Sequence, residues 1–110
     1  NVYLYHELPH ASRRAAALEM ARVCKPGGLV VWVDSVQSGD RPPLDATLGN
    51  FQYLNEPHYP TYIAEDVGAL FVAAGLEPFE KHTSSTSKCL SFVKPCTSTD
   101  DCVVTKVARF

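Results

Sequence analysis

The chain lacks an excess of charge of either sign. Its 110 residues include ten Lys or Arg and twelve Asp or Glu, which gives a formal net charge of -2. Proteins that bind nucleic acids carry excess or clustered Lys and Arg, so this composition argues against a nucleic-acid partner. Long apolar runs are lacking too. The longest one with strand character is Leu29–Val33, far short of the roughly 18 residues that a membrane span needs. We therefore expect one globular domain and no membrane span.

Paired cysteine motifs are also absent. None of the four cysteines belongs to a C-x-x-C pair or lies near a spaced pair of histidines, so no metal site is expected. Cys24 falls in a predicted helix and Cys89 in a predicted strand, which favours buried thiols over a disulfide framework. Cys96 and Cys102 lie in a polar tail, where pairing requires an oxidising environment. We expect the cytoplasm or another reducing compartment.

The first third of the chain has the pattern of a strand, a helix and a second strand. β-branched and aromatic residues favour a strand over Asn1–Glu7. Apolar positions with helical spacing follow, with Arg13 and Arg14 on the opposite, solvated face, until Pro26-Gly27-Gly28 ends the helix. Leu29–Asp34 is apolar at every position but the last, which is typical of a parallel strand buried on both faces. The three elements predict a right-handed, parallel βαβ unit.

A long irregular segment separates this unit from the next helix. Prolines and glycines interrupt Ser35–Pro60, with room for one short helix around Leu44–Tyr53. Connections of this length without regular structure are often functional. A helix is expected over Tyr62–Ala74, where apolar residues again repeat on one face. Gly75 then ends this helix, and Leu76 folds back on its last turn.

The C-terminal part of the pattern is a hairpin. Pro78–Thr83 and Lys88–Lys94 read as short strands joined by a polar link. That link is too short for a parallel crossover, so one of the two strands runs antiparallel. Residues 95–110 have no clear place in the fold.

Candidate site residues gather at the carboxyl ends of the two predicted parallel strands, where ligands bind in open α/β sheets. Tyr5, His6 and Glu7 end the first strand, and Asp34 and Ser35 end the second. The long connection adds three more, which are Glu56, His58 and Tyr59. A histidine beside carboxylates acts as a general base or orients a substrate. The structural alternatives are a strand-end hydrogen bond for His6, helix capping for Glu7 and turn formation for Asp34.

These motifs together resemble a known family. The run H-E-L-P after a strand, the helix ending in R-V-C-K-P-G-G and the strand L-V-V-W-V-D resemble the C-terminal half of class I S-adenosylmethionine-dependent methyltransferases. The similarity is strongest to the methyltransferase type 11 group, which includes ubiquinone and menaquinone biosynthesis enzymes. The segment E-D-V-G-A-L-F-V-A-A-G-L resembles the family's next helix, and the hairpin corresponds to its strands six and seven.

The resemblance implies an α/β fold. Residues 1–94 are expected to form the C-terminal part of a Rossmann-like seven-stranded methyltransferase sheet, with parallel strands and a terminal antiparallel hairpin. Residues 95–110 are expected to be a tail of uncertain structure. An open sheet edge also predicts poor solubility for the isolated chain.

The implied activity is methyl transfer from S-adenosylmethionine to a small organic acceptor. Tyr5 and His6 correspond to positions near the methionine portion of the cofactor or its methyl group, with His6 as the candidate base. The substrate side corresponds to Glu7, Asp34, Ser35, Glu56, His58 and Tyr59. The family's glycine-rich loop and its ribose and adenine contacts have no match in the chain. Two alternatives are an inactive methyltransferase-like fragment, or interaction remnant, and, ranked last, a dinucleotide-binding dehydrogenase.

Overall fold

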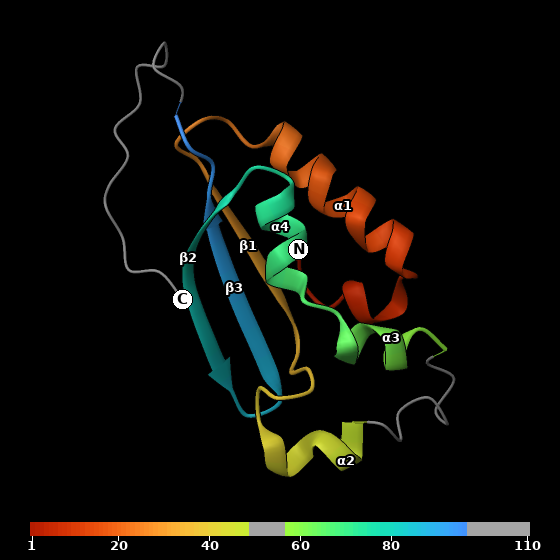
Figure 1. Cartoon of the computed structure of the whole chain (residues 1–110). Coiled ribbons are helices and arrows are strands. Elements are labelled where there is room, and N and C mark those ends of the chain that lie inside the picture. The colour runs from red at the N-terminus through yellow and green to blue at the C-terminus, as the bar shows by residue number, and fades with distance from the viewer. Residues whose placement is uncertain (49–56, 97–110) are drawn as a thin grey trace.

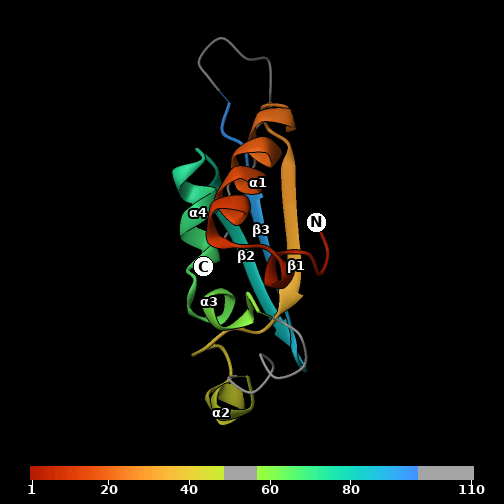
Figure 2. The ribbon, with the colours of Figure 1, turned by 90° about the vertical axis from the view of Figure 1, so that its right-hand side faces the viewer.

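The computed structural model describes residues 1–48 and 57–96, which form a three-stranded sheet with helices on one face (Figures 1 and 2). The strands are β1 (Leu29–Ser35), β2 (Glu77–Ser84) and β3 (Ser87–Val93). Their order is β1-β3-β2, and the central β3 is antiparallel to both neighbours. The predicted hairpin is therefore confirmed, whereas no parallel pair occurs among these three strands.

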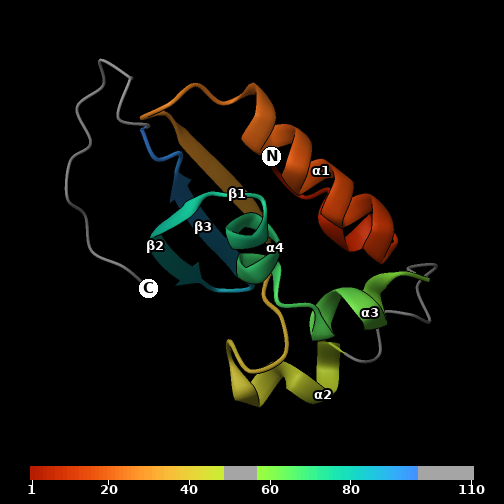
Figure 3. The ribbon, with the colours of Figure 1, turned by 45° about the horizontal axis from the view of Figure 1, so that its top comes forward.

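The helices lie along the sheet and beyond its lower end. The short η2 and α2 are apart from the helices that cover the sheet (Figures 1 and 3). No helix in the described part of the chain is both long enough and apolar enough to cross a membrane. In chain order the helical elements are η1 (Tyr5–Glu7), α1 (His10–Val23), η2 (Pro42–Leu44), α2 (Asp45–Leu48), α3 (Tyr59–Ala64) and α4 (Val67–Ala73).

The strand expected over Asn1–Glu7 is reduced to a single bridge. Val2 pairs in parallel with Val33. Tyr3 then adopts a left-handed φ of 51°, and the chain turns away from the sheet into η1. The strand prediction is therefore wrong beyond this bridge, and so is the regular parallel βαβ unit built on it.

Aromatic packing explains why the chain leaves the sheet. Tyr5 is fully buried, with its ring centroid 6.0 Å from Phe71 and 5.7 Å from Trp32. Phe71 in turn stacks on Phe92 at 4.6 Å. Burying one large apolar side chain contributes about 1.5–3 kcal/mol, while the whole scale of β propensities spans only about 1 kcal/mol. Core packing thus outweighs the local strand pattern.

The strand β1 is buried on one face only. Val30, Trp32 and Asp34 point toward the helices and are buried, while Leu29 and Val31 on the opposite face are exposed. The expected burial of both faces is wrong for the described residues, because their helices cover a single face of the sheet (Figure 2). The apolar composition of the strand therefore did not show whether helices cover both of its faces or only one.

The helix α1 buries the predicted apolar face together with one cation. Ala17 is fully buried, and so is Arg13, which was expected in solvent. Arg13 Nη2 donates to Thr61 Oγ1 at 2.7 Å, and its Nε lies 3.6 Å from Glu65 Oε1. Arg13 precedes Ala17 by four residues and therefore lies on the same helix face. The helical spacing therefore indicated that Arg13 lies on the buried face, whereas its charge favoured the predicted position in solvent.

The helix expected over Tyr62–Ala74 is divided into α3 and α4. Asp66 starts α4 by accepting a hydrogen bond from the backbone N–H three residues on, at 3.1 Å, which is the N-cap role that Asp favours. At the other end, Gly75 has a φ of 96° and the Leu76 N–H donates to the Phe71 carbonyl. This fold-back confirms the predicted helix end.

The remaining sequence predictions for this part of the chain have mixed outcomes. The short helix around Leu44–Tyr53 is present as α2, and its residues beyond 48 lie outside the described residues. Cys24 and Cys89 are free and half-buried. Cys96 is disulfide-bonded, so the assumption that the tail cysteines stay reduced is wrong for this residue.

The stacked pair in the core provides a test of the packing argument. Replacing Phe71 with alanine is expected to lower the free energy of unfolding by about 3–5 kcal/mol, because a fully buried ring leaves a cavity. Val72→Ala is the matched control on the same helix, since Val72 is 49% exposed, and its cost should be much smaller. Urea unfolding of both variants measures the difference. Equal losses would contradict the placement of Phe71 in the core.

Candidate functional site

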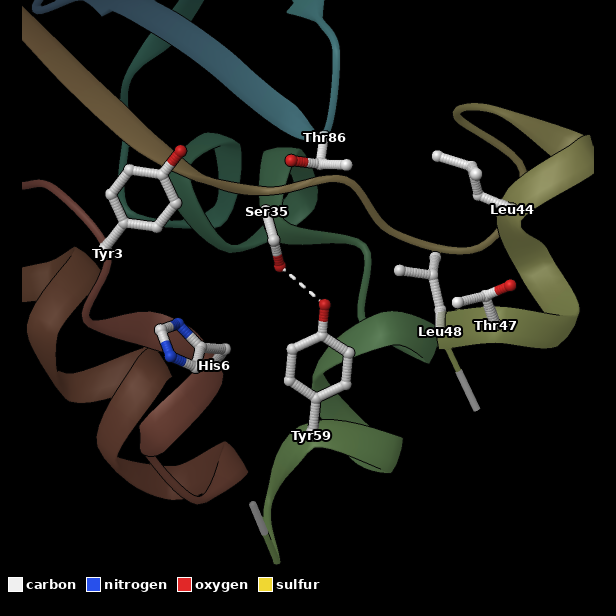
Figure 4. Close-up of a pocket in the computed structure, with 8 residues that line it drawn as sticks. All are labelled: Tyr3, His6, Ser35, Leu44, Thr47, Leu48, Tyr59 and Thr86. Atoms are coloured by element: carbon white, nitrogen blue, oxygen red, sulfur yellow. Dashed lines mark hydrogen bonds between the residues drawn. The ribbon is translucent and has the colours of Figure 1, made fainter. Parts of the chain in front are cut away.

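A pocket of about 330 Å³ lies at the carboxyl end of β1 (Figure 4). Leucine side chains and tyrosine rings form its apolar walls, and Ser and Thr hydroxyls supply polar groups. His6 contributes the single imidazole, and no described lining residue is Asp, Glu, Lys or Arg. Concave, mostly apolar pockets with a few polar groups are typical of small-molecule sites. The lining residues are Tyr3, His6, Ser35, Leu44, Thr47, Leu48, Tyr59 and Thr86.

The buried carboxyl group of Asp34 positions His6. Asp34 Oδ1 lies 2.8 Å from His6 Nδ1, and Oδ2 accepts the His6 backbone N–H at 3.2 Å. The Ser35 N–H also donates to Oδ1, at 2.7 Å. A carboxylate only accepts hydrogen bonds, so the geometry assigns the ring hydrogen to Nδ1 and leaves the lone pair on Nε2. The imidazole is thus oriented with one nitrogen available as a proton acceptor.

Tyrosines of α3 connect the end of β1 to the pocket wall. Ser35 Oγ and Tyr59 Oη are hydrogen-bonded at 2.8 Å (Figure 4), and the Tyr62 hydroxyl donates to the Ser35 carbonyl. Burial, and then the nearby Asp34 carboxylate, raise the pKa of Tyr62 far above its ordinary value, so this hydroxyl remains a donor. The His6 ring centroid lies 5.9 Å from Tyr59 and 6.2 Å from Tyr62.

Tyr3 closes the pocket on the side of the N-terminal turn. Its backbone N–H donates to the Val33 carbonyl at 2.7 Å, and its hydroxyl is hydrogen-bonded to Ser87 Oγ. A left-handed conformation costs a non-glycine residue roughly 1–2 kcal/mol. These two contacts hold Tyr3 in that conformation and join the N-terminal turn to the hairpin.

A buried polar network holds the segment that follows β1. Gln37 Nε2 donates to the Tyr62 and Glu65 carbonyls at 2.6 Å, and Lys88 Nζ donates to Gln37 Oε1 at 2.9 Å. Lys88 also pairs with Asp40 at 2.9 Å. Burial raises the pKa of Asp40, but the Gln37 N–H and the two lysine contacts outweigh it, so the pKa lies below its usual range. The network fixes the path toward η2 and α2.

Three sequence-predicted site residues meet at the pocket, namely His6, Ser35 and Tyr59. Asp34 lies behind His6 and is fully buried, so it contacts the imidazole and does not line the pocket. The Tyr5 side chain is in the core. Tyr5 is not among the residues that line the pocket. The predicted position of Tyr5 beside the cofactor therefore does not bring its hydroxyl into the pocket.

The other predicted residues lie around this centre. Glu7 is exposed, with Oε1 3.9 Å from His6 Nε2. His58 precedes α3, and its carbonyl accepts the Tyr62 N–H at 3.0 Å. Glu56 lies outside the described residues.

Two further histidines, His10 and His82, have no partner that their spacing in the sequence indicates. His82 is exposed. His10 is exposed as well, but its Nδ1 lies 2.5 Å from Glu65 Oε1, a partner that sequence spacing does not indicate. Across residues 1–48 and 57–96, no three His, Cys, Asp or Glu side chains gather where they could ligate one metal ion.

Sequence reasoning missed several residues of the pocket wall. Leu44 and Leu48 have the four-residue spacing of one helix face, which was a usable signal inside the predicted short helix. Tyr3 was assigned to a strand, and Thr86 belongs to the hairpin turn, where only the folded sheet brings it near β1. The missed lining residues are Tyr3, Leu44, Thr47, Leu48 and Thr86.

Comparison with known proteins gives a likeness to a solved structure. No protein-family model matches the chain, and no curated protein matches it. Among solved structures, the chain is similar to human N-acetylserotonin methyltransferase in complex with SAM, with a TM-score of 0.62 and 18% sequence identity. The likeness covers 86% of this chain and 28% of that enzyme. At this identity it shows the fold alone: the described residues have the fold of part of a methyltransferase.

The Asp40 network predicts a loss of stability in acid. Because the folded pKa of Asp40 is lowered, its stabilising contribution is complete above the unfolded value of roughly 3.9 and is lost as pH falls through the folded pKa. The Asp40→Asn variant should be less stable than the wild type at pH 7, and the gap should narrow toward pH 2. Urea titrations at both pH values test this, and a gap that widens in acid would contradict it.

Proposed function

We propose that residues 1–94 form the C-terminal, substrate-side part of an S-adenosylmethionine-dependent methyltransferase that acts on a small organic acceptor. The fold shared with part of a SAM-bound methyltransferase supports this class of activity. The pocket supports a small, uncharged acceptor, since no described lining residue carries a carboxylate, ammonium or guanidinium group.

The observation that carries the proposal is the pairing of His6 with Asp34 at a pocket whose described lining is otherwise uncharged. Methyl transfer from a sulfonium is a direct displacement, so the protein mainly holds donor and acceptor in line. A base is needed where the acceptor must lose a proton. His6 Nε2 takes that proton in our proposal, and the Asp34 carboxylate holds the ring and stabilises the resulting imidazolium.

This assignment changes the role of Asp34. The sequence placed it on the substrate side, but its carboxyl group is buried and engaged by three N–H groups of His6 and Ser35. Asp34 is therefore proposed as a positioning residue. Ser35 and Tyr59, whose hydroxyls are hydrogen-bonded to each other at the pocket, are proposed as acceptor-contacting residues.

The cofactor fits this chain only in part. When bound, S-adenosylmethionine supplies the methyl group. The pocket offers His6 near the expected methyl-bearing end, but its described lining contains no acidic residue for a ribose and the sequence has no glycine-rich turn between a strand and a helix. Contacts to the nucleoside are therefore assigned to polypeptide outside these 110 residues.

The isolated chain is accordingly expected to bind S-adenosylmethionine too weakly to measure. Isothermal titration calorimetry of the 110-residue chain tests this directly. Micromolar affinity would contradict the view that the ribose and adenine contacts lie elsewhere.

The proposed base is tested in a protein that carries this segment together with a cofactor-binding part. His6→Gln and Asp34→Asn should each lower kcat by roughly 10²–10⁴, the usual contribution of general acid–base catalysis, while the Kd for S-adenosylmethionine stays within about twofold. Glu7→Gln is the control, since Glu7 is exposed beside the same ring. Unchanged turnover in His6→Gln would remove the base from the mechanism.

The second candidate function is a methyltransferase-like interaction remnant without activity. The open face of the sheet, on which Leu29 and Val31 are exposed, favours it. The same two-part protein separates the candidates, because a remnant gives no methyl transfer from S-adenosylmethionine even with both parts present.

A further inference from the structure

Arg13 is a buried cation with few partners. Its side chain is fully buried, yet Nε and Nη1 have no hydrogen-bond partner among the described residues. Burial lowers the pKa of Arg13, and the Glu65 carboxylate, 3.6 Å from Nε, offsets only part of this effect. A buried ion pair is weak evidence for stability, because well-packed apolar residues in its place are often as stable. The hydrogen bond from Arg13 Nη2 to Thr61 is therefore better explained by what it holds in place.

A chain of hydrogen bonds leads from Arg13 to the first turn of α3. Arg13 Nη2 donates to Thr61 Oγ1 at 2.7 Å, and the Thr61 hydroxyl donates to the His58 carbonyl at 3.0 Å. A hydroxyl accepts and donates at once, so both bonds form together. The same carbonyl accepts the Tyr62 N–H at 3.0 Å, which closes the first turn of the helix. The guanidinium is thus fixed to the start of α3.

The helix α3 depends on contacts of this kind. It has six residues, and no side chain caps its N-terminus. Isolated helices shorter than about 12–15 residues are marginal in water, so contacts with other elements set the position of α3. The end of β1 provides two of them, because the Tyr59 and Tyr62 hydroxyls are bonded to Ser35. Arg13 of α1 provides another through Thr61.

The helix that carries Arg13 continues directly from the turn that carries His6. Leu8 and Pro9 alone separate η1 from α1, and the Arg13 N–H donates to the Pro9 carbonyl at 3.0 Å. These segments lie beside α3 (Figures 1 and 3). Arg13 therefore links the segment of the imidazole to the helix of Tyr59, whose ring centroid lies 5.9 Å from that of His6.

We propose that Arg13 is a positioning residue, which holds α3 through Thr61 so that the Tyr59 ring stays beside His6 at the pocket. The inference rests on the proposed function, in which His6 is the base and Tyr59 contacts the acceptor. Arg13 does not line the pocket, so it acts only through α3. The position of α3 matters because a misplacement of about 1 Å can cost roughly 10²-fold in rate.

The first test measures this geometry in the 110-residue chain, without methyl transfer. Nuclear Overhauser effects should connect the ring protons of His6 and Tyr59 in the wild type. Thr61→Val removes the hydroxyl at an exposed position and should reduce these effects to roughly half or less, because so short a helix follows its contacts. Thr61→Ser keeps the hydroxyl and should preserve them.

The arginine is tested in the same way. Arg13→Met should reproduce the effect of Thr61→Val, and the double variant should show no further change, because both substitutions remove the same bond. Arg14→Met is the control, since Arg14 is the exposed neighbour on the same helix. Unchanged Overhauser effects in Thr61→Val would overturn the proposal, and so would their loss in Thr61→Ser.

A second measurement separates this inference from the proposed function. Fluorescence titration gives the Kd of the chain for 2-naphthol, an uncharged aromatic probe with one hydroxyl. We expect binding about tenfold weaker in Thr61→Val than in Thr61→Ser, the effect of about one hydrogen bond. Equal affinities would contradict a role of Arg13 and Thr61 in acceptor binding. Absent binding in every variant, together with the expected Overhauser effects, would contradict the proposed acceptor pocket and still support Arg13 as the residue that positions Tyr59.

Discussion

The buried carboxyl group of Asp34 is the contact on which the site depends. It accepts hydrogen bonds from the His6 backbone, the His6 ring and the Ser35 backbone. Burying a carboxyl group is costly unless donors satisfy it, and these three do so. The two bonds from His6 fix the turn η1 against the last residues of β1. The N-terminal turn, which sequence pattern assigned to a strand, is thereby attached to the sheet by the Asp34 side chain as well as by the contacts of Asn1 and Tyr3.

Further hydrogen bonds extend from Ser35, which follows Asp34, to the helix α3. Ser35, fixed by its amide, is bonded through its hydroxyl to Tyr59 and through its carbonyl to Tyr62, so α3 is held at the end of β1. The network of Gln37, Asp40 and Lys88 then holds the chain that leads to α2. The pocket therefore joins segments that are far apart in sequence (Figure 4).

Sequence patterns correctly predicted the elements that depend on residues close together in the chain. The apolar face of α1, the Gly75 helix end and the hairpin of β2 and β3 follow from spacing, from glycine conformation and from loop length. The sequence also brought His6 and Asp34 together, because each follows an apolar run that ends at the same edge. Their direct hydrogen bonds, with Asp34 behind the imidazole, required the folded chain.

Tertiary packing decided the predictions that failed. Tyr5 has the propensity of a strand residue but packs between Trp32 and Phe71. Arg13 has the charge of a surface residue but is buried with Thr61 and Glu65 as partners. In both cases a contact with α3 or α4, distant in sequence, outweighs the preference of the residue itself for a strand or for solvent. The propensity or charge of a single residue does not predict such a contact.

The central claim is that Asp34 fixes the His6 ring with hydrogen on Nδ1 and leaves Nε2 to accept a proton. Long-range ¹H–¹⁵N correlation spectra of the ring measure this tautomer directly. At a pH where the ring is neutral, the wild-type chain should show a protonated Nδ1 and an unprotonated Nε2, and Asp34→Asn should lose this preference. A neutral ring protonated on Nε2, or a tautomer unaffected by Asp34→Asn, would contradict the account.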